Sequence, residues 1–339
     1  MRLVRRLVVL AGAVILSVAV ASTANAAGVD SARSYRPIEL GTLGGGFSTA
    51  TSLNDFDDVV GSSQLAQGPG FHAFLWHRGR MTDLGTLPGG AFSGASDIND
   101  RGQIVGQSTT ATGVGHAVLW QHGTVSDLGT LGGPDSTAVA VNDRGQVVGT
   151  SSTAGGQLHG FLWCNGMLTD LGDFLPVDVN DRGQIAGYTS RIGAQAASFR
   201  WQDGTLTDVG SLAAYTYAAA IDLYGTVVGR AGKVSIAGVS DVGFVWRHGT
   251  FTELGTDGGV HNPTAVSLND VGQVVGYAQT TADPVQFHPL RWQHGTVVDL
   301  TTVGVLPGIV WKVNNRGHLA GIRTTQGGPP LQPHAVLYV

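Results

Sequence analysis

Residues 93–129 read SGASDINDRGQIVGQSTTATGVGHAVLWQHGTVSDLG. Three polar or Gly-containing segments, at 99–102, 107–115 and 121–123, divide this stretch into four short apolar runs. Asn and Gly tolerate the left-handed backbone of tight hairpins, and β-branched residues between such turns favour strands. The stretch therefore predicts four antiparallel strands within about 40 residues, which is the size of one blade of a β-propeller.

The same pattern recurs seven times along the chain. An Asn or Asp anchor marks the first turn of each unit, 38 to 47 residues after the previous anchor, at Asn54, Asn99, Asn142, Asn180, Asp222, Asn269 and Asn314. A glycine follows each anchor by seven residues, at Gly61, Gly106, Gly149, Gly187, Gly229, Gly276 and Gly321. An aromatic residue ends the third run, at Trp76, Trp120, Trp163, Trp201, Trp246, Trp292 and Tyr338. Self-similarity at this period indicates a repeat architecture.

The two ends of the array indicate how it closes. The last unit stops after its third run, at 334–339, whereas residues 38–45 look like a fourth strand and exit loop with no unit before them. A ring would pair these two ends and remove an exposed sheet edge, whereas an open solenoid would need capping repeats. We therefore predict an all-β fold with almost no helix. It is a seven-bladed β-propeller of four-stranded blades over 38–339, closed by the N-terminal strand completing the C-terminal blade.

The first residues have the form of an export signal. Arg2, Arg5 and Arg6 precede an apolar run at 7–21, and Ala-Asn-Ala at 24–26 provides small residues for cleavage. This pattern predicts a signal peptide over 1–26, cut between Ala26 and Ala27, and a short lead segment over 27–37. An uncleaved membrane anchor is the alternative. No other apolar run approaches the ~18 residues of a membrane helix, so no membrane span is expected after cleavage. An extracellular or cell-surface location follows.

The composition excludes several classes of protein. Gly supplies 52 of the 339 residues, and charged residues are only 13%. Without the three N-terminal Arg, 16 basic residues face 24 acidic ones, a net charge of −8. Such a chain repels phosphate backbones, so nucleic acid is not an expected partner. The single Cys164 cannot form an internal disulfide, so core packing must hold the exported chain together.

Three motifs of the repeat are specific enough to compare with a known family. His-Ala-Phe-Leu-Trp at 72–76, with variants at 116–120 and 159–163, is similar to the motif that names the HAF family of extracellular repeat proteins. Asp-Leu-Gly-Thr-Leu-Gly-Gly at 127–133 and Asn-Asp-Arg-Gly-Gln-Val-Val-Gly at 142–149 resemble its other signatures. The resemblance covers nearly all of 38–339 and implies secretion and a repeat fold, but no particular activity. Units four and five depart from it, with Ala-Ser-Phe at 197–199 and Val-Gly-Phe at 242–244.

The recurring polar residues have structural interpretations. The repeated histidines are His72, His116, His159, His288 and His334. Separate blades set these side chains too far apart to surround one metal ion, so we expect a repeated hydrogen bond instead. The Asn-Asp turns lack the pattern of an EF-hand, and we expect both side chains to cap their own turns. The Trp residues are expected in the core, with Trp311 out of register. No metal site, cofactor or catalytic residue is predicted, because nucleophile-elbow and phosphate-loop motifs are absent from the sequence.

Function is expected where the units differ, in the segments 62–71, 107–115, 150–158, 188–196, 230–241, 277–286 and 322–333. These segments are polar and uncharged for the most part, and Tyr188, Tyr215, Tyr217 and Tyr277 would add aromatic surface near them. Loops on a rigid scaffold concentrate binding residues. We therefore predict a secreted, non-catalytic binding or surface-interaction module for a glycan, a peptide or a cell-surface component, with its oligomeric state left open.

The alternative is an extracellular, glycan-directed hydrolase or lyase with a cross-blade site at the central pocket. Acids or histidines meeting at the axis would favour that alternative, because glycoside chemistry needs facing carboxylates. A pocket lined only by Gly, Ala, Ser and Thr would exclude it.

Overall fold

The computed structural model describes residues 34–68, 70–189, 196–210, 213–236, 238–256, 260–280, 286–306, 308–323 and 333–339. These residues belong to one unit, Arg33–Val339. The predicted signal peptide over 1–26 and most of the lead segment over 27–37 lie outside the described residues, so both remain predictions. The variable segments at 62–71, 188–196, 230–241, 277–286 and 322–333 are described only in part.

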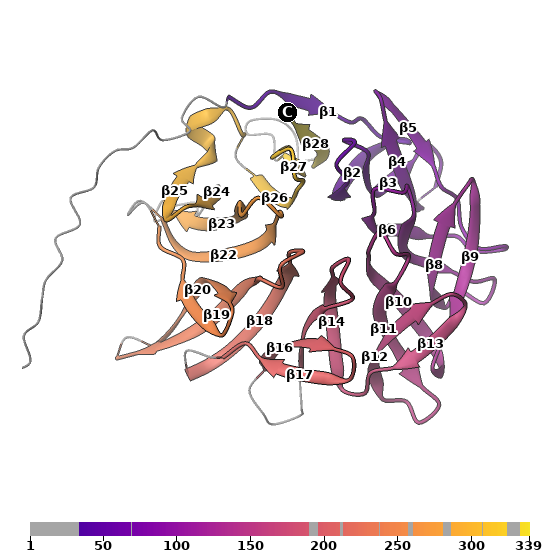
Figure 1. The fold of residues 1–339 in the computed structure, drawn as a ribbon. Coiled ribbons are helices and arrows are strands. Elements are labelled where there is room, and N and C mark those ends of the chain that lie inside the picture. The colour runs from indigo at the N-terminus through magenta and orange to yellow at the C-terminus, as the bar shows by residue number, and fades with distance from the viewer. Residues whose placement is uncertain are drawn as a thin grey trace, which may run out of the picture. The chain divides into compact units, whose positions relative to one another are not determined.

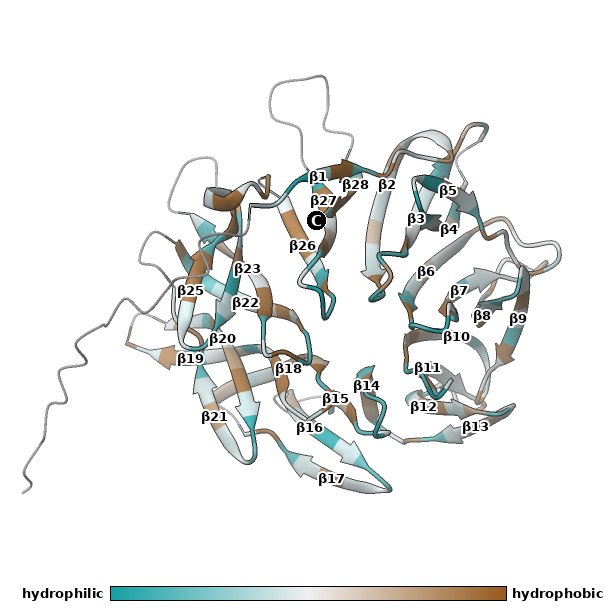
Figure 2. Cartoon of the chain, turned by 45° about the horizontal axis from the view of Figure 1, so that its top comes forward, coloured by the Kyte–Doolittle hydropathy of each residue, from teal (hydrophilic) through white to brown (hydrophobic). Residues whose placement is uncertain are grey.

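Seven four-stranded antiparallel sheets are arranged around a common axis (Figures 1 and 2). Blade 1 contains β2 (Gly44–Leu53), β3 (Val59–Leu65), β4 (Phe71–His77) and β5 (Arg80–Asp83). Blade 2 contains β6 (Ser93–Ile98), β7 (Ile104–Thr109), β8 (Gly115–Gln121) and β9 (Thr124–Gly129). Blade 3 contains β10 (Gly132–Val141), β11 (Val147–Thr153), β12 (Leu158–Cys164) and β13 (Met167–Asp170). Blade 4 contains β14 (Phe174–Val179), β15 (Ile185–Thr189), β16 (Ala197–Gln202) and β17 (Thr205–Asp208).

The second half of the chain repeats this order. Blade 5 contains β18 (Ala213–Ile221), β19 (Val227–Ser235), β20 (Gly238–Arg247) and β21 (Thr250–Glu253). Blade 6 contains β22 (Val260–Leu268), β23 (Val274–Thr280), β24 (Phe287–Gln293) and β25 (Thr296–Asp299). Blade 7 contains β26 (Gly308–Val313), β27 (Leu319–Arg323), β28 (His334–Tyr338) and, outside β28, β1 (Pro37–Glu39). The predicted all-β fold of seven four-stranded blades is confirmed, and the one helical segment among the described residues is the 3₁₀ turn η1 (Leu300–Val303).

The glycine seven residues after each anchor is required by a close approach between the first two strands of its blade. In each blade the innermost strand has a register shift just before its anchor, as between Ala95 and Asp97. The shift brings a backbone carbonyl against the second strand. A Cβ built on Gly106 would lie 2.1 Å from the carbonyl oxygen of Gly94, and one on Gly276 would lie 1.9 Å from that of Thr264. No side chain fits at that distance, so only glycine is tolerated there.

The apolar core lies between neighbouring blades. The cluster at the first junction joins Val60 and Ala73 of blade 1 to Ile104, Val118 and Trp120 of blade 2. Trp76, Trp120, Trp246 and Trp292 are buried, whereas Trp163 and Trp201 are half-buried. In blade 7, Tyr338 takes the place of the Trp and is only 1% exposed. Each blade therefore depends on its neighbour for burial of its apolar residues.

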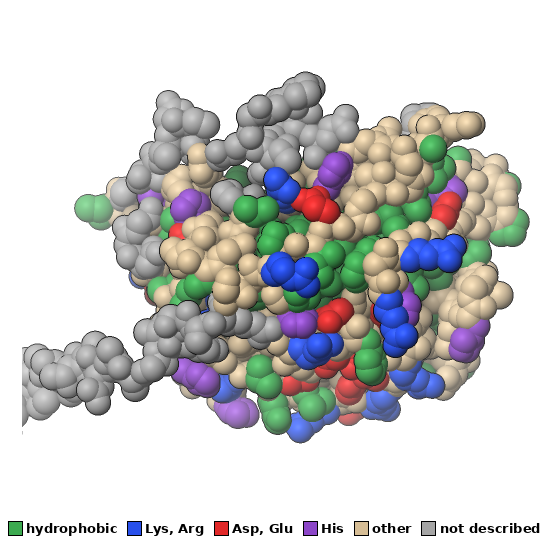
Figure 3. Space-filling model, turned by 90° about the horizontal axis from the view of Figure 1, so that it is seen from above, with side chains coloured by type: hydrophobic (Ala, Val, Ile, Leu, Met, Phe, Trp, Pro, Cys, Tyr) green, Lys and Arg blue, Asp and Glu red, His purple; other side chains and the backbone are tan. Residues whose placement is uncertain are grey.

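The antiparallel path gives the ring two different faces. The anchor turns and the hairpins between the third and fourth strands lie on one face, which we call the turn face. The loops between the second and third strands and the connectors between blades lie on the other, the connector face. Charged residues recur in the turns, as in Asn-Asp-Arg-Gly at 99–102, whereas the connectors are rich in Gly, Thr and Leu. In the edge-on view of Figure 3, most visible charged side chains lie toward one face.

Candidate functional site

Three of the four tyrosines predicted as binding residues come together on the connector face. The ring of Tyr188, at the end of β15, meets the ring of Tyr217 edge-on at a centroid distance of 5.1 Å. The ring of Tyr215, two residues before Tyr217 on β18, lies 5.6 Å from the Tyr217 ring. Two neighbouring blades therefore contribute to one aromatic cluster.

The cluster borders an open cavity of about 480 Å³, which we call the tyrosine pocket. It is lined by Ala196, Ala214, Tyr215, Tyr217, Val239, Ser240, Asp241 and Asn262. These residues come from blades 4, 5 and 6. The volume lies within the ~300–1,000 Å³ that small-molecule sites occupy.

A charged pair holds the tyrosines in place. Arg230 is the backbone pairing partner of Tyr217, and its guanidinium carbon lies 5.1 Å from the centre of the Tyr217 ring and 6.0 Å from that of Tyr215. Its Nη1 lies 3.5 Å from Oδ2 of Asp241. The Tyr215 hydroxyl donates a hydrogen bond to Oδ1 of the same carboxylate. This bond, together with partial burial, raises the pKa of Tyr215, so the phenol keeps its proton.

Tyr277, the fourth predicted tyrosine, lies elsewhere. It occupies the same position on β23 of blade 6 that Tyr188 occupies on β15 of blade 4. Its ring packs edge-on against Phe287 at 5.5 Å. The four predicted tyrosines therefore do not form one surface. Three of them form a cluster, and the fourth, Tyr277, pairs with Phe287.

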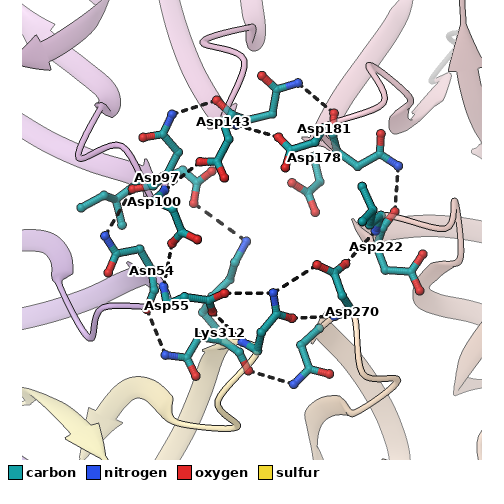
Figure 4. A pocket seen from close by; sticks show the side chains of 18 of the residues that line it. Asn54, Asp55, Asp97, Asp100, Asp143, Asp178, Asp181, Asp222, Asp270 and Lys312 are labelled. Carbon is teal, nitrogen blue, oxygen red and sulfur yellow. Dashed lines mark hydrogen bonds and ion pairs between the residues drawn. The ribbon is translucent and has the colours of Figure 1, made fainter.

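A second site lies at the axis, where the sequence analysis placed the alternative catalytic site without naming its residues. A pocket there is lined by the anchor turns of all seven blades, and the close-up in Figure 4 shows its carboxylates around a central space. Its acidic residues are Asp55, Asp97, Asp100, Asp143, Asp178, Asp181, Asp222 and Asp270, and its one basic residue is Lys312. The pocket is therefore not lined by small residues alone, and acids converge there.

Most of these acids bind backbone groups of neighbouring blades. Asp100 accepts a hydrogen bond from the backbone N–H of Asp55 at 2.8 Å, and Asp143 accepts one from Asp100 at 2.9 Å. The prediction that both residues of the Asn-Asp pair cap their own turn is right for Asn and wrong for Asp. The Asn99 side-chain oxygen does accept from Arg101 and Gln103 within its turn, but the neighbouring Asp reaches across to the next blade.

A deeper layer of the axial pocket contains Asp97, Asp178 and Lys312. Asp97 accepts from the Ser52 hydroxyl at 2.6 Å and from the Val141 N–H at 3.0 Å. Asp178 accepts from two backbone N–H groups, both at 2.9 Å. The ammonium of Lys312 lies 3.8 Å from Asp97. These carboxylates also hold adjacent blades together.

Burial and mutual repulsion shift the ionisation of the axial groups. Burial raises the pKa of Asp178, with repulsion from Asp97 adding to the effect. Burial also raises the pKa of Asp100 and of Asp143, and neighbouring carboxylates add to it. Burial alone would lower the pKa of Lys312, but Asp97 and Asp178 outweigh it and the pKa is raised. Within the described segments, no three His, Cys, Asp or Glu side chains are grouped to hold a metal ion.

Four of the five repeated histidines form the repeated hydrogen bond expected from the sequence. The fifth, His334, differs: its Nδ1 lies 3.9 Å from Glu39 and its Nε2 lies 3.2 Å from the carbonyl oxygen of Gly46. His72 lies 2.9 Å from Asp83, and His116 lies 2.7 Å from Asp127, in each case through Nδ1 of the ring. His159–Asp170 and His288–Asp299 make the same pair in blades 3 and 6. Burial alone would raise the pKa of Asp170, but hydrogen bonds from His159 and from the Gly172 N–H lower it. Each pair joins the third strand of its blade to the fourth.

Trp311, which is out of register with the other tryptophans, and the single Cys164 lie away from both pockets' linings. Trp311 is half-buried and, with Thr49, Thr51, Ala219 and Val266, lines a separate cavity of about 470 Å³. Cys164 is half-buried at the end of β12 and carries a free thiol.

A search of the described residues for a helix of sufficient length and apolar character to span a membrane finds none.

Known proteins resemble this chain in fold. No family model and no curated protein sequence matches it. The chain is similar to the solved structure of an oligogalacturonate lyase from Vibrio parahaemolyticus, with a TM-score of 0.56 and 8% identity over 90% of this chain and 93% of that chain. It is also similar to an acylaminoacyl peptidase from Pyrococcus horikoshii, with a TM-score of 0.51 and 10% identity over 85% of this chain and 51% of that chain.

A third similarity is to the β-propeller domain of the Trilobed protease from Pyrococcus furiosus, with a TM-score of 0.49 and 8% identity over 72% of this chain and 80% of that chain. Function does not follow from fold at identities this low. The seven four-stranded sheets arranged around one axis identify the chain as a β-propeller.

Proposed function

We propose that this protein is a secreted, non-catalytic binding protein that holds its ligand in the tyrosine pocket. The observation that carries the proposal is the convergence of Tyr215, Tyr217 and Asp241 at an open cavity, with Tyr188 and Arg230 packed against the Tyr217 ring. The export signal in the sequence and the resemblance to extracellular repeat proteins support secretion.

The chemistry of the tyrosine pocket suits a polar ligand with some apolar surface, such as a glycan or a peptide. Tyrosine offers a large, rigid contact area with a polar tip, and it loses little conformational entropy on binding. The tyrosines are anchored on β15 and β18 and not on loops, so their geometry is set before a ligand arrives. A preorganised site retains more of its contact energy as affinity.

The test is binding by the mature chain, residues 27–339, to purified polysaccharides, cell-wall fractions and peptide libraries. Tyr217→Ala should weaken binding to the retained ligand by at least about tenfold, which is about 1.4 kcal/mol. Tyr277→Ala is the matched control, because it removes the same side chain from a connector-facing strand of another blade, and it should bind as the wild type does. Equal binding by the Tyr217 variant, or a folded wild-type chain that retains no ligand, would contradict the proposal.

A second candidate function is a glycan-directed hydrolase or lyase at the axial pocket. It is favoured by one observation, the presence of Asp97 and Asp178 in one cavity with Lys312 between blades. The hydrogen bonds of these carboxylates argue against the catalytic candidate, because each carboxylate already accepts two hydrogen bonds from the protein. Turnover of a polysaccharide by the wild type that disappears in a folded Asp178→Asn variant would support this candidate over simple binding.

A further inference from the structure

The polar groups around the tyrosine pocket both donate and accept hydrogen bonds. Asp241, in the lining, supplies acceptors, and Arg230, which packs against both tyrosine rings beside the lining, supplies donors. Ser240 and Asn262, which also line the cavity, can each do both. Asp241 is the one charged residue of this lining, and Arg230 lies 3.5 Å from it, so the Arg230–Asp241 pair carries no net charge. A hydroxyl group also donates and accepts, and a ring bearing several hydroxyls therefore matches this set best.

Asn262 adds a second, independent observation. Its φ is 53°, in the left-handed region, which few L-residues adopt and in which Asn is more frequent than most. The other seven non-glycine residues with positive φ lie in turns between strands, whereas Asn262 lies within β22. The register of β22 against β23 shifts between His261 and Thr264, so Asn262 stands in a β-bulge. Bulges turn a side chain away from the regular pleat, and such strain is found where the side chain is used.

The bulge places an amide on the wall of the tyrosine pocket that blade 6 contributes. Its one hydrogen bond to another side chain within the described residues is a long one, from Nδ2 to Oε1 of Gln279 at 3.4 Å. The amide oxygen and the second N–H direction are therefore available for a ligand. Asn262 lines the pocket together with residues of blades 4 and 5, so a ligand that fills it would meet three blades.

Charged ligands fit this pocket less well than neutral ones. An anion would have to share Arg230 with Asp241, which lies 3.5 Å away, and would approach a mature chain with a net charge of −8. A cation would compete for a carboxylate that already accepts from Tyr215. A neutral sugar leaves the Arg230–Asp241 pair intact and can place its apolar ring face against a tyrosine.

We infer, on the basis of the proposed function, that the tyrosine pocket recognises a neutral sugar ring, and that Asn262 is a specificity-determining residue for it. The mature wild-type chain should retain neutral glycans on a glycan array in preference to galacturonate oligomers, which are anionic, and glucosamine oligomers, which are cationic. In titration calorimetry with the best neutral glycan, Asn262→Gly should lower the affinity at least tenfold. Its thermal stability should not fall, because glycine adopts a positive φ freely.

The matched control is Asn165→Gly. Asn165 has a φ of 50° in a hairpin of blade 3 on the turn face, so this variant makes the same backbone change away from the pocket. It should bind as the wild type does. Asp241→Asn should also lower the affinity for the neutral glycan, because an amide offers fewer acceptor positions than a carboxylate.

The possible results distinguish the specificity for a neutral sugar from the role of the tyrosine pocket as the binding site. Preferred retention of a charged glycan or of a peptide, with binding lost in Tyr217→Ala, would overturn the sugar inference and leave the tyrosine pocket as the site. Unchanged glycan affinity in Asn262→Gly would overturn the role of Asn262. Neutral-glycan binding that Tyr217→Ala does not affect would overturn both.

Discussion

The side-chain amide of Asn314, in blade 7, donates a hydrogen bond to the backbone carbonyl oxygen of Asn54, in blade 1, at 2.9 Å. The two residues are 260 positions apart in the chain. Corresponding bonds join Asn54 to Asn99, Asn99 to Asn142, Asn142 to Asn180, Asn180 to Asp222 and Asn269 to Asn314, at 2.7–3.2 Å. The repeated anchor is thus a junction between blades as well as a turn.

Replacing Asp222 with Asn should stabilise the protein. Asp222 is the one anchor without an amide, and its Oδ2 is buried with no hydrogen-bond partner in the described part of the chain. In Asp222→Asn an amide N–H could reach the carbonyl of Asn269 and complete the series. We expect a gain of about 1 kcal/mol in the free energy of unfolding, measured by urea denaturation. The reverse change, Asn142→Asp, should lower the free energy of unfolding by at least as much. An Asp222→Asn variant that is less stable than the wild type would contradict the role of the anchors as junctions between blades.

Removal of β1 should weaken the ring. A chain that begins at Gly41 lacks β1 and the bonds between Arg36 and Val339 and between Leu40 and Ala335, and it exposes the edge of β28. We expect a loss of at least about 3 kcal/mol in the free energy of unfolding, from lost hydrogen bonds and the lost burial of Leu40. Aggregation in size-exclusion chromatography should accompany it. A chain that begins at Arg33 is the control, and equal stability of the two chains would show that β1 does not hold the ring closed.

The protein should lose stability in alkali through Tyr338. Burial raises the pKa of Tyr338 to about 12 from its usual value of 10.0. Between these values the unfolded chain releases the proton and the folded chain keeps it, so the free energy of unfolding falls as pH rises. The contribution is fully retained below pH 10 and decreases by about 1.4 kcal/mol per pH unit above it.

The measurement is urea denaturation between pH 9 and 11.5. Tyr338→Phe should show a shallower loss than the wild type, whereas Tyr224→Phe, at an exposed tyrosine, should follow the wild type. An identical pH slope in the wild type and the Tyr338 variant would contradict the assignment.

The fold could be predicted from the sequence because each blade repeats the same local signals. Asn99 with Gly102 identifies a hairpin. A glycine equivalent to Gly106 is present in every unit, where a carbonyl of the bulged first strand approaches the second strand. The reason for Gly106 could not be predicted, because the contact with Gly94 depends on a register shift that the residue pattern does not reveal.

The candidate site could be predicted only in part. Tyr188, Tyr215 and Tyr217 stand out as aromatic residues near variable segments, but their meeting depends on the packing of blade 4 against blade 5. The same packing decides that Tyr277 stays apart. Asn262 gave no sequence signal, because its left-handed backbone follows from a bulge in β22.

The axial acids did leave a signal in the sequence. Two positions before each anchor the residues are Ser52, Asp97, Ala140, Asp178, Ala220, Ser267 and Lys312. The residue between this position and the anchor is aliphatic in every unit. Such variation at one position of a regular repeat marks a place where the blades differ, and this place lies on the axis and not in the loops.

Hydrogen–deuterium exchange of the mature chain, with and without the glycan it retains, tests the account most directly. If the ligand occupies the tyrosine pocket, peptides covering β18 to β20 and the start of β22 should exchange more slowly when it is bound, and the anchor turns should not change. Slower exchange confined to the anchor turns, such as 99–103 and 180–184, would place the ligand at the axis and contradict the account.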